Sequence, residues 1–508
     1  MFIRQLKNRS GSISIQVIEK KNGNYIVLKS FGSSKDPNEI EMLLFEARGF
    51  VQNPTGSSPL FSNLSIEDLT IKNFFNTLKN ASVRTIGPEL IFGTIFDRIG
   101  FNIIQEPLFR HLIIARLTYP TSKLKTVDYL YRYQGIHTHE DTVYRFLDTL
   151  SDVHKKTVER ISYEHTKKTI GTISVVFYDM TTLYFETEDE DDLRKIGFSK
   201  DGKFQCPQIM IGLLVGEGGY PIGYDIFEGN TFEGKTLIPI LKKLQKKYGF
   251  DKPIVVADAA MLSKNTLEEL VKEKYSFIIG ARIKNETEAI KREILLSREK
   301  MRYGDICTIM KEDGNQLIVS LSDKRARKDA HNREKGLKKL RLKVKSGILT
   351  KNSITNRGYN KFLNLSQDVS VVIDEEKIKN DERWDGLKGY VTNTILPSEK
   401  VIENYSHLWQ IEKAFRISKT DLRIRPIYHH KRKRIEAHLC IAFVAYSIWK
   451  ELERLLTEKK IEMSPKRAGE LTHTMYEFYY ILPNSKKSAK QILGMDDEQQ
   501  LLYDAVWK

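Results

Sequence analysis

Two short apolar runs, ISVVFYD (Ile173–Asp179) and IVVAD (Ile254–Asp258), are rich in β-branched residues, and each ends in an aspartate. Runs of this length and composition are typical of buried strands. Between them lie QIMIGLLV (Gln208–Val215) and PIGYDIF (Pro221–Phe227), which a glycine-rich turn separates, and then a helical pattern over residues 233–248. Strand, hairpin, helix and strand in this order predict an α/β layer with a mixed sheet.

The chain as a whole has the composition of a basic globular protein. It has 508 residues, of which 40% are hydrophobic and 29% are charged, and a formal net charge of +16. This length predicts about three domains. The positive charge favours a polyanionic partner, most simply nucleic acid.

The sequence gives no sign of a membrane or export segment. The longest apolar stretch, Ile441–Trp449, is too short to cross a bilayer, so no membrane partner is expected. The first ten residues, MFIRQLKNRS, lack the apolar part of a signal peptide. The three scattered cysteines suit a reducing compartment, so we expect a cytoplasmic protein.

The first third of the chain predicts a β-hairpin followed by helices. Alternating apolar residues flank Asn22 and Gly23, a combination typical of a hairpin, so residues 1–50 are predicted to form a hairpin region. Residues 51–170 have mainly helical periodicity and are expected to bind DNA. Within them, residues 123–150 read as helix, glycine-containing turn and helix. This pattern permits a helix-turn-helix DNA reader, but shape alone favours an ordinary helical hairpin.

Asp179 and Asp258 are candidate metal ligands. Both stand where an apolar run ends, and in open α/β sheets ligands gather at the carboxyl ends of strands. Two carboxylates close enough to repel each other are costly unless a cation binds between them, and hard oxygen ligands suit Mg²⁺ or Mn²⁺. Many α/β enzymes have two such aspartates for other reasons.

A third acid lies on a later helical segment, YSHLWQIEKAFRISK (Tyr405–Lys419). At about 100° per residue, one face of this helix carries Tyr405, Leu408, Glu412, Arg416 and Lys419. Glu412 is thus flanked by a phenol and two cations. A solvated helix with an ordinary Glu412–Arg416 ion pair explains the same spacing.

Four longer segments surround these acids: YDMTTLYFE (Tyr178–Glu186), GFSKDGK (Gly197–Lys203), FEGNTFEGKT (Phe227–Thr236) and VADAAMLS (Val256–Ser263). Together with the late helix, they resemble the insertion-sequence DDE transposases whose signature is Y-(2)-R-(3)-E-(6)-K. Tyr405, Glu412 and Lys419 reproduce that spacing. Leu408 stands where the signature has arginine, so a phosphate contact by that arginine is absent or is supplied by Arg416 or His407.

The resemblance implies an α/β fold with a ribonuclease-H-like mixed-sheet core and a mostly helical N-terminal DNA-binding region. The core would be discontinuous, because 153 residues separate Asp258 from Glu412. The implied parts are residues 171–284 and 396–455 for the core, 285–395 for a β-rich insertion, and 456–508 for a helical C-terminal region.

The resemblance also implies a chemistry. Asp179, Asp258 and Glu412 would be the catalytic residues and would hold two divalent metal ions, Mg²⁺ or Mn²⁺, which activate a water or 3′-hydroxyl and stabilise the leaving oxygen. The reaction would be cut-and-paste transposition, that is, cleavage at the transposon ends followed by strand transfer. The partners would be double-stranded DNA, as terminal inverted repeats and as target, and further copies of the chain in a homodimer or larger assembly. Such a protein would be associated with the nucleoid.

Several residues are predicted to contact DNA. The resemblance implies that Tyr405 and Lys419 lie beside the scissile phosphate, with Arg416 as a candidate for the contact of the missing arginine; helix packing and solvation are the alternative interpretation of Tyr405 and Lys419. The run Lys324–Lys345 has eleven Lys and Arg residues against two acids, and a solvated helix is its alternative interpretation. Within this run we expect contacts from Lys324, Arg325, Arg327 and Lys328. A second basic run, HHKRKR (His429–Arg434), follows the late helix.

Two other functions fit the same residues. One is a catalytically inactive, transposase-derived DNA-binding protein, and the other is a different ribonuclease-H-like nuclease such as a junction resolvase. The presence of all three acids favours activity, and the length of the chain favours transposition over simple cutting.

Overall fold

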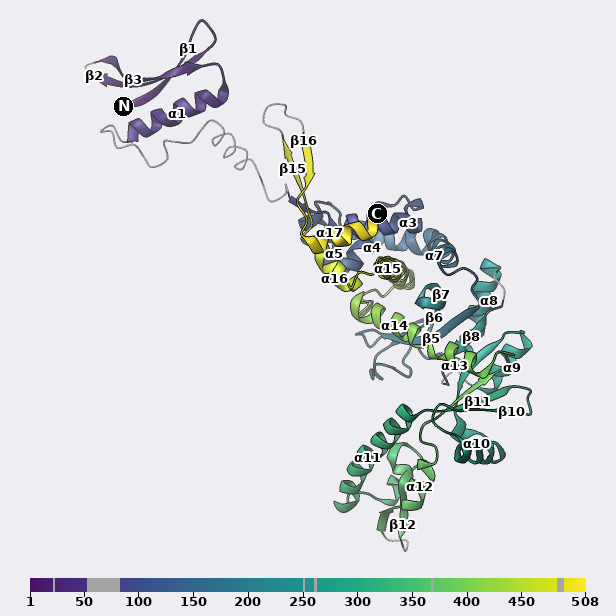
Figure 1. Cartoon of the computed structure of the whole chain (residues 1–508). Coiled ribbons are helices and arrows are strands. Elements are labelled where there is room, and N and C mark those ends of the chain that lie inside the picture. The colour runs from purple at the N-terminus through teal and green to yellow at the C-terminus, as the bar shows by residue number, and fades with distance from the viewer. Residues whose placement is uncertain (22, 53–82, 250–251, 260–262, 367–369, 482–487) are drawn as a thin grey trace. The chain divides into compact units, whose positions relative to one another are not determined.

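The structure, a computed structural model, describes residues 1–21, 23–52, 83–249, 252–259, 263–366, 370–481 and 488–508. The chain divides into two compact units. One comprises Met1–Ile86, Tyr133–Gly135 and Met475–Gly494; the other comprises Gly87–Arg132, Ile136–Thr474 and Met495–Lys508. Figure 1 labels most of their elements. No helix in the described part of the chain is both long and apolar enough to cross a membrane.

The first unit begins with an antiparallel sheet of β1 (Phe2–Lys7), β2 (Ile13–Lys21) and β3 (Asn24–Ser34), with β2 in the centre. Lys21 pairs with Asn24, which confirms the predicted hairpin; Asn22 itself lies outside the described residues. The structure adds β1 and a helix, α1 (Pro37–Gln52), which packs on the sheet and buries Ala47. Alternation around one turn predicts a pair of strands, but it does not show what covers them.

A second small sheet in this unit corrects the prediction of a helical C-terminal region. Its strands are β4 (Val83–Thr85), β15 (Tyr476–Ile481) and β16 (Ser488–Ile492), in the order β16-β15-β4. The segment YEFYYI of β15 is rich in aromatic residues, which favour strands. The residues around it are helical, as α16 (Pro465–Thr472) and α17 (Asp497–Trp507).

An eight-stranded mixed sheet organises the second unit, and it confirms the predicted α/β layer. The strand order is β10-β11-β14-β9-β8-β5-β6-β7. The first five strands along the chain are β5 (Val175–Tyr184), β6 (Gln208–Val215), β7 (Pro221–Glu228), β8 (Ile254–Ala257) and β9 (Phe277–Ala281). Strands β5, β8 and β9 are parallel, whereas β6 and β7 are antiparallel to their neighbours.

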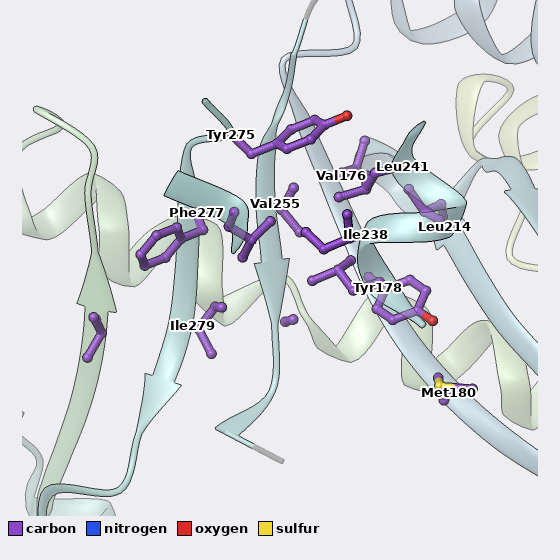
Figure 2. Close-up of a cluster of buried hydrophobic side chains, with 14 of the residues drawn as sticks. Val176, Tyr178, Met180, Leu214, Ile238, Leu241, Val255, Tyr275, Phe277 and Ile279 are labelled. Atoms are coloured by element: carbon purple, nitrogen blue, oxygen red, sulfur yellow. The ribbon is translucent and has the colours of Figure 1, made fainter. Parts of the chain in front are cut away.

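One face of this sheet packs on α8 (Leu237–Tyr248) and α9 (Lys264–Lys272). Figure 2 shows Tyr178 of β5, Val255 of β8 and Phe277 of β9 in one cluster with Ile238 and Leu241 of α8. Because side chains alternate along a strand, the residue after Tyr178, Asp179, belongs to the opposite face.

That opposite face is covered by α13 (Ser398–Ser406) and α14 (Trp409–Arg416). Helix α13 packs on β8, β9 and β14, and α14 packs on β5 and β6. The long helix α15 (Arg432–Glu458), which is buried over most of its length, follows them. It packs against the N-terminal helices of this unit, α3 (Thr94–Ile99), α4 (Pro107–Thr118), α6 (Glu140–Thr149) and α7 (Lys155–Ile170).

The helix pair predicted over residues 123–150 is present as α5 (Lys123–Gln134) and α6. Helix α6 buries Val143, Phe146 and Leu147, and its N-cap is His139, whose ring nitrogen accepts a hydrogen bond from the Asp141 backbone N–H. The role of this pair as a DNA reader stays a prediction.

Residues 285–395 differ from the predicted β-rich insertion. Three of their strands, β10 (Ile306–Met310), β11 (Gln316–Leu321) and β14 (Leu387–Thr392), extend the large sheet, because β14 pairs with β9. The rest is largely helical, as α10 (Glu288–Lys300), α11 (Asp323–Lys345) and α12 (Glu375–Glu382), with a short pair of strands, β12 (Leu363–Ser366) and β13 (Ser370–Ile373). Leu337 and Leu340 of α11 pack with Phe362 and Ile378 in a separate small core.

Arg333 anchors the basic helix α11 to the turn that precedes β14. Its guanidinium donates two hydrogen bonds to the Asp385 carboxylate, at 2.6 and 2.7 Å, and both side chains are largely buried. Arg333→Ala is expected to lower the free energy of unfolding by about 3 kcal/mol, because it leaves a buried carboxylate unpaired. Urea unfolding measures this change. Arg341→Ala is the matched control on the same helix, since Arg341 is half exposed and lies 3.8 Å from its nearest carboxylates; an equal loss in both variants contradicts the anchoring role.

Candidate active site

The two aspartates lie next to each other on parallel strands. Tyr178 of β5 pairs with Ala257 of β8, so Asp179 and Asp258 follow at the next register position. Asp258 comes directly after β8, as predicted. The prediction that Asp179 ends its strand is wrong, because β5 continues to Tyr184. The residues after Asp179 pair with β6, a long-range contact that local pattern does not reveal.

Asp179 is partly buried and has two charged neighbours. The Lys200 ammonium lies 3.6 Å from its carboxylate and 2.8 Å from that of Glu233. Lys200 also donates to the Met180 carbonyl, at 2.6 Å. Burial raises the pKa of Asp179, as do the negative charges of Glu233 and Asp258, and Lys200 and the Met180 backbone N–H only partly offset this. Asp179, Asp258 and Glu233 therefore form a group of mutually repelling acids around one lysine.

Asp258 is held by a tyrosine from α13. Its Oδ1 accepts hydrogen bonds from the Tyr405 hydroxyl, at 3.1 Å, and from the Ala259 N–H, at 2.7 Å. Tyr405 is buried, and it reaches the strand end because residue 280 is glycine: a Cβ there would lie 2.5 Å from the phenol oxygen. Burial and the Asp258 carboxylate raise the pKa of Tyr405, so its hydroxyl stays a donor. The predicted DNA contact of Tyr405 is untested, and its hydroxyl is already bonded to Asp258.

The late helix is interrupted, which corrects the prediction of one continuous stripe. It breaks at His407 and Leu408, between α13 and α14, and a π-helical turn, Ile417–Asp421, follows Arg416. Leu408, in the arginine position of the signature, is buried. An arginine there would point into the apolar interior, so the leucine fits its surroundings.

Glu412 is exposed on α14 and lies near the same centre. The Lys388 ammonium of β14 sits 4.5 Å from the Tyr405 ring centroid. Burial and Arg325 lower the pKa of Lys388, and the carboxylates of Asp258 and Glu412 oppose that shift. Both acids are therefore within electrostatic reach of one ammonium group. A solvated surface helix would be expected to have an ion pair between Glu412 and Arg416. The ion pairs of the described residues do not include it.

The three predicted acids are neighbours but are not gathered tightly. Among the residues that the structure describes, no group of three His, Cys, Asp or Glu side chains is close enough to hold a metal ion. Two ammonium groups, those of Lys200 and Lys388, lie among the acids instead. Sequence reasoning missed Lys200, Glu233 and Lys388 as site residues. Lys200 lies in GFSKDGK and Glu233 in FEGNTFEGKT. The resemblance of these two segments to a transposase family could have pointed to both residues.

The remaining predicted DNA contacts differ in their surroundings. Arg416 is exposed. Lys419 is mostly buried and lies 3.1 Å from the Asp201 carboxylate, which also pairs with Arg425 at 2.7 Å. On α11, the four predicted residues are all exposed: Lys324, Arg325, Arg327 and Lys328. Arg325 and Arg327 pair with acids of the same helix, at 3.6 and 2.7 Å, whereas neither lysine has an ion-pair partner among the described residues.

A model of the Transposase DDE domain matches residues 170–448, more than half of the chain, so the chain belongs to this family. The match includes β5, β8 and α14, the elements that carry Asp179, Asp258 and Glu412.

Two curated relatives are named transposases. The chain is 30% identical over 124 residues to the transposase for insertion sequence element IS231E of Bacillus thuringiensis subsp. finitimus, covering 23% of this chain and 26% of the relative. It is 33% identical over 98 residues to the IS231D transposase of the same organism, covering 18% and 20%. The alignments thus span about a quarter or less of these relatives. Among solved structures, a piggyBac transposase synaptic complex with hairpin DNA is similar over 76% of both chains, at 8% identity and a TM-score of 0.40.

Lys200 is expected to hold the acid group together when no metal is bound. Lys200→Met should lower the free energy of unfolding by about 1–3 kcal/mol, because it leaves partly buried carboxylates without their cation. Millimolar Mg²⁺ should recover part of this loss in the variant. Urea unfolding with and without Mg²⁺ measures both effects. Lys203→Met, an exposed lysine three residues away, is the control; if both variants behave alike, Lys200 does not have this role.

Proposed function

We propose that this chain is the DNA transposase of an insertion sequence, which binds the transposon ends and carries out metal-dependent cleavage and strand transfer. The observation that carries the proposal is the pairing of Asp179 and Asp258 on neighbouring parallel strands in a chain of the DDE transposase-domain family. Glu412 supports it, because α14 packs on the strand of Asp179.

The fold that this function implies is a ribonuclease-H-like core. Strands β7-β6-β5 form an antiparallel meander, and β8 and β9 continue the sheet parallel to β5. This arrangement supports such a core, with residues 171–284 and 396–455 as its two parts. The helices α10–α12 would then stand between the second aspartate and the glutamate.

The acid group fits divalent cations in its donor chemistry. Its oxygens are hard ligands suited to Mg²⁺ or Mn²⁺, and repulsion among Asp179, Glu233 and Asp258 is the kind that a bound cation relieves. Lys200 already places a positive charge between two of these acids. Asp179, Asp258 and Glu412 would hold the ions. Two such ions supply an activated water or 3′-hydroxyl and stabilise the leaving oxygen.

The protein's own residues orient these ligands. Tyr405 and the Ala259 N–H both donate to Oδ1 of Asp258, which leaves Oδ2 for a cation. Lys200, which bonds to the Met180 carbonyl of β5, holds Asp179 in place. Its ammonium group would have to move away from the carboxylate when a cation binds there. Lys388, near Asp258 and Glu412, is suited to neutralise the charge that develops on a phosphate between them. Glu412 is exposed, so it is free to approach the two aspartates when DNA is bound.

The exposed basic face of α11 would hold DNA. At the start of α11, Lys324 and Lys328 have no ion-pair partner among the described residues. Arg325 lies close enough to Lys388 to lower the pKa of Lys388. DNA bound along α11 would therefore reach the acid group. The spacing of Tyr405, Glu412 and Lys419 supports the Y-(2)-R-(3)-E-(6)-K group, with the buried Leu408 as a departure. Two ends must be cut together, so the working form would be at least a homodimer on DNA in the cytoplasm, at the nucleoid.

The proposal is tested with the full-length protein and DNA from either side of its reading frame, which should carry terminal inverted repeats. With Mg²⁺ or Mn²⁺ we expect nicks that expose a 3′-hydroxyl at the repeat, followed by joining to a target plasmid. With EDTA we expect neither. A shuffled repeat of the same composition is the control.

Three results would contradict the proposal. Binding of the repeats without cleavage under any metal condition indicates an inactive, transposase-derived DNA-binding protein. Cleavage of four-way junctions regardless of end sequence indicates a junction resolvase. Equal cleavage of the repeat and the shuffled DNA removes the end specificity that transposition requires.

A further inference from the structure

A pocket of about 400 Å³ in the second unit is lined by basic residues from several elements. They are Arg116 of α4, Lys123 and Lys125 at the start of α5, Arg423 and Arg425 after the π-helical turn, His429 before α15 and His438 in α15. None of the residues that line this pocket in the described structure is Asp or Glu. None of the residues of the acid group lines this pocket, and one of its cations, Arg425, pairs with Asp201 at 2.7 Å.

Two of these cations are buried without a counter-charge. Lys123 is 6% exposed and Arg116 is 5% exposed. Arg116 donates to the backbone carbonyls of Leu422 and Arg423, at 3.4 and 3.1 Å, and has no carboxylate partner among the described residues. The Lys123 ammonium has no hydrogen-bond or ion-pair partner among them. Burial lowers the pKa of Lys123, and so does the charge of Arg116. A buried, unpaired cation is costly unless an anion joins it.

The other groups in the pocket are also donors. His429 is 7% exposed, and burial, together with the charges of Lys123, Arg434 and Arg116, lowers its pKa to about 3, so its ring is neutral and keeps one N–H. The pocket also includes the first residues of α5, a helix of 12 residues, whose N-terminal N–H groups favour anions. Arginine, lysine and a helix N-terminus together form a donor set suited to phosphate oxygens.

The basic run His429–Arg434 helps to locate this site. Three of its cations are already paired inside the protein: Arg432 with Glu436 and Asp192, Lys433 with Asp152, and Arg434 with Asp148. Lys431 of this run, and Lys125 and Arg423 of the pocket, are exposed and have no ion-pair partner among the described residues. The buried cations without one are Arg116 and Lys123.

We propose that this pocket binds a phosphate group, held by Lys123, Arg116, the first turn of α5 and His429. If the proposed function holds, that phosphate belongs to the backbone of bound DNA, and the pocket holds the DNA at a point separate from the acid group. A free phosphate or pyrophosphate ion has the same chemistry, so the experiment must distinguish the two sources.

The test compares the parent protein with Lys123→Met and Lys123→Arg. Without any anion, Lys123→Met should keep or raise the melting temperature, because it removes an unpaired buried charge. In the first arm, millimolar inorganic phosphate at constant ionic strength should raise the melting temperature of the parent and of Lys123→Arg, but not of Lys123→Met. In the second arm, Lys123→Met should weaken binding of repeat DNA about tenfold and reduce the slope of log K against log salt by about 1. Lys168→Met, an exposed lysine on α7, is the matched control.

Each outcome decides one question. A change in DNA binding supports DNA as the source of the phosphate, with or without a shift from free phosphate. A phosphate-dependent shift with unchanged DNA binding supports a free ion. If Lys123→Met changes neither, the proposal is overturned. Should Lys123→Met fail to fold, His429→Gln is carried through the same two arms. Because no arm requires cleavage, a parent that binds but does not cut DNA counts against the proposed function and leaves this site standing.

Discussion

Replacing Asp179 or Asp258 with asparagine is expected to abolish DNA cleavage, by at least about 10³-fold, which is about 4 kcal/mol of transition-state stabilisation. Asparagine keeps the shape of each side chain but removes the charge that would hold a divalent cation under the proposed function. The two acids are neighbours, Asp179 in β5 and Asp258 directly after β8, and each would contribute its own carboxylate to the site. Single-turnover cleavage of labelled repeat DNA in Mg²⁺ measures the loss.

The fold and DNA binding should survive both changes. Burial and neighbouring acids raise the pKa of Asp179, so the folded protein disfavours its charged form, and Lys200 keeps Glu233 as a partner at 2.8 Å when residue 179 is neutral. Asp225→Asn is the control, since Asp225 lies in β7 of the same sheet and pairs with Lys243 at 2.8 Å. Cleavage by Asp258→Asn within about tenfold of the parent would be incompatible with a role in holding metal.

Removing the unpaired lysines of α11 is expected to have the second largest effect. The double variant Lys324→Ala, Lys328→Ala should weaken binding of repeat DNA by about 10- to 100-fold near physiological salt, and it should reduce the salt slope by about 2. Changing Arg325 and Arg327 in the same way should have a smaller effect, because acids of α11 already neutralise part of their charge. Fluorescence anisotropy across a salt series measures affinity and slope together.

The control for this prediction is the double variant Lys459→Ala, Lys466→Ala, which removes two exposed lysines at and after the end of α15. It changes net charge equally but leaves α11 intact. If both double variants lose the same affinity, general charge and not this helix face attracts DNA. If neither loses any, α11 is a solvated helix.

Local pattern predicted the parts of the fold that depend on near neighbours in the chain. The strands that contain Asp179 and precede Asp258, the hairpin between them and the helix α8 all follow from apolar runs and turns. The pairing of β14 with β9 joins residues more than a hundred positions apart. Local sequence pattern does not reveal such a pairing, and it therefore placed β10, β11 and β14 in a separate insertion. The strands β15 and β16 were not predicted, because they lie in the chain between two helices, α16 and α17, and the whole region was assigned as helical.

A site residue could be predicted where one short motif contains both a reactive side chain and the end of a strand. Asp258 follows an apolar run and stands at its end. Leu408 is a departure from the signature that only burial explains, and the break after Tyr405 cannot be read from periodicity, because both halves keep a helical pattern. Lys200 lies in a turn after β5 and Glu233 begins a short helix after β7, and a single sequence does not reveal that Lys200 pairs with both Asp179 and Glu233.

The central claim is that Glu412, from a distant helix, joins Asp179 and Asp258 in one metal-dependent centre that cuts DNA. The most direct measurement is single-turnover cleavage of repeat DNA by Glu412→Gln in Mg²⁺, with Glu403→Gln on the exposed side of α13 as the control. The account predicts that Glu412→Gln binds the DNA like the parent and cuts it at least about 10³-fold more slowly, while Glu403→Gln cuts normally. Cleavage by Glu412→Gln at the parental rate would contradict it.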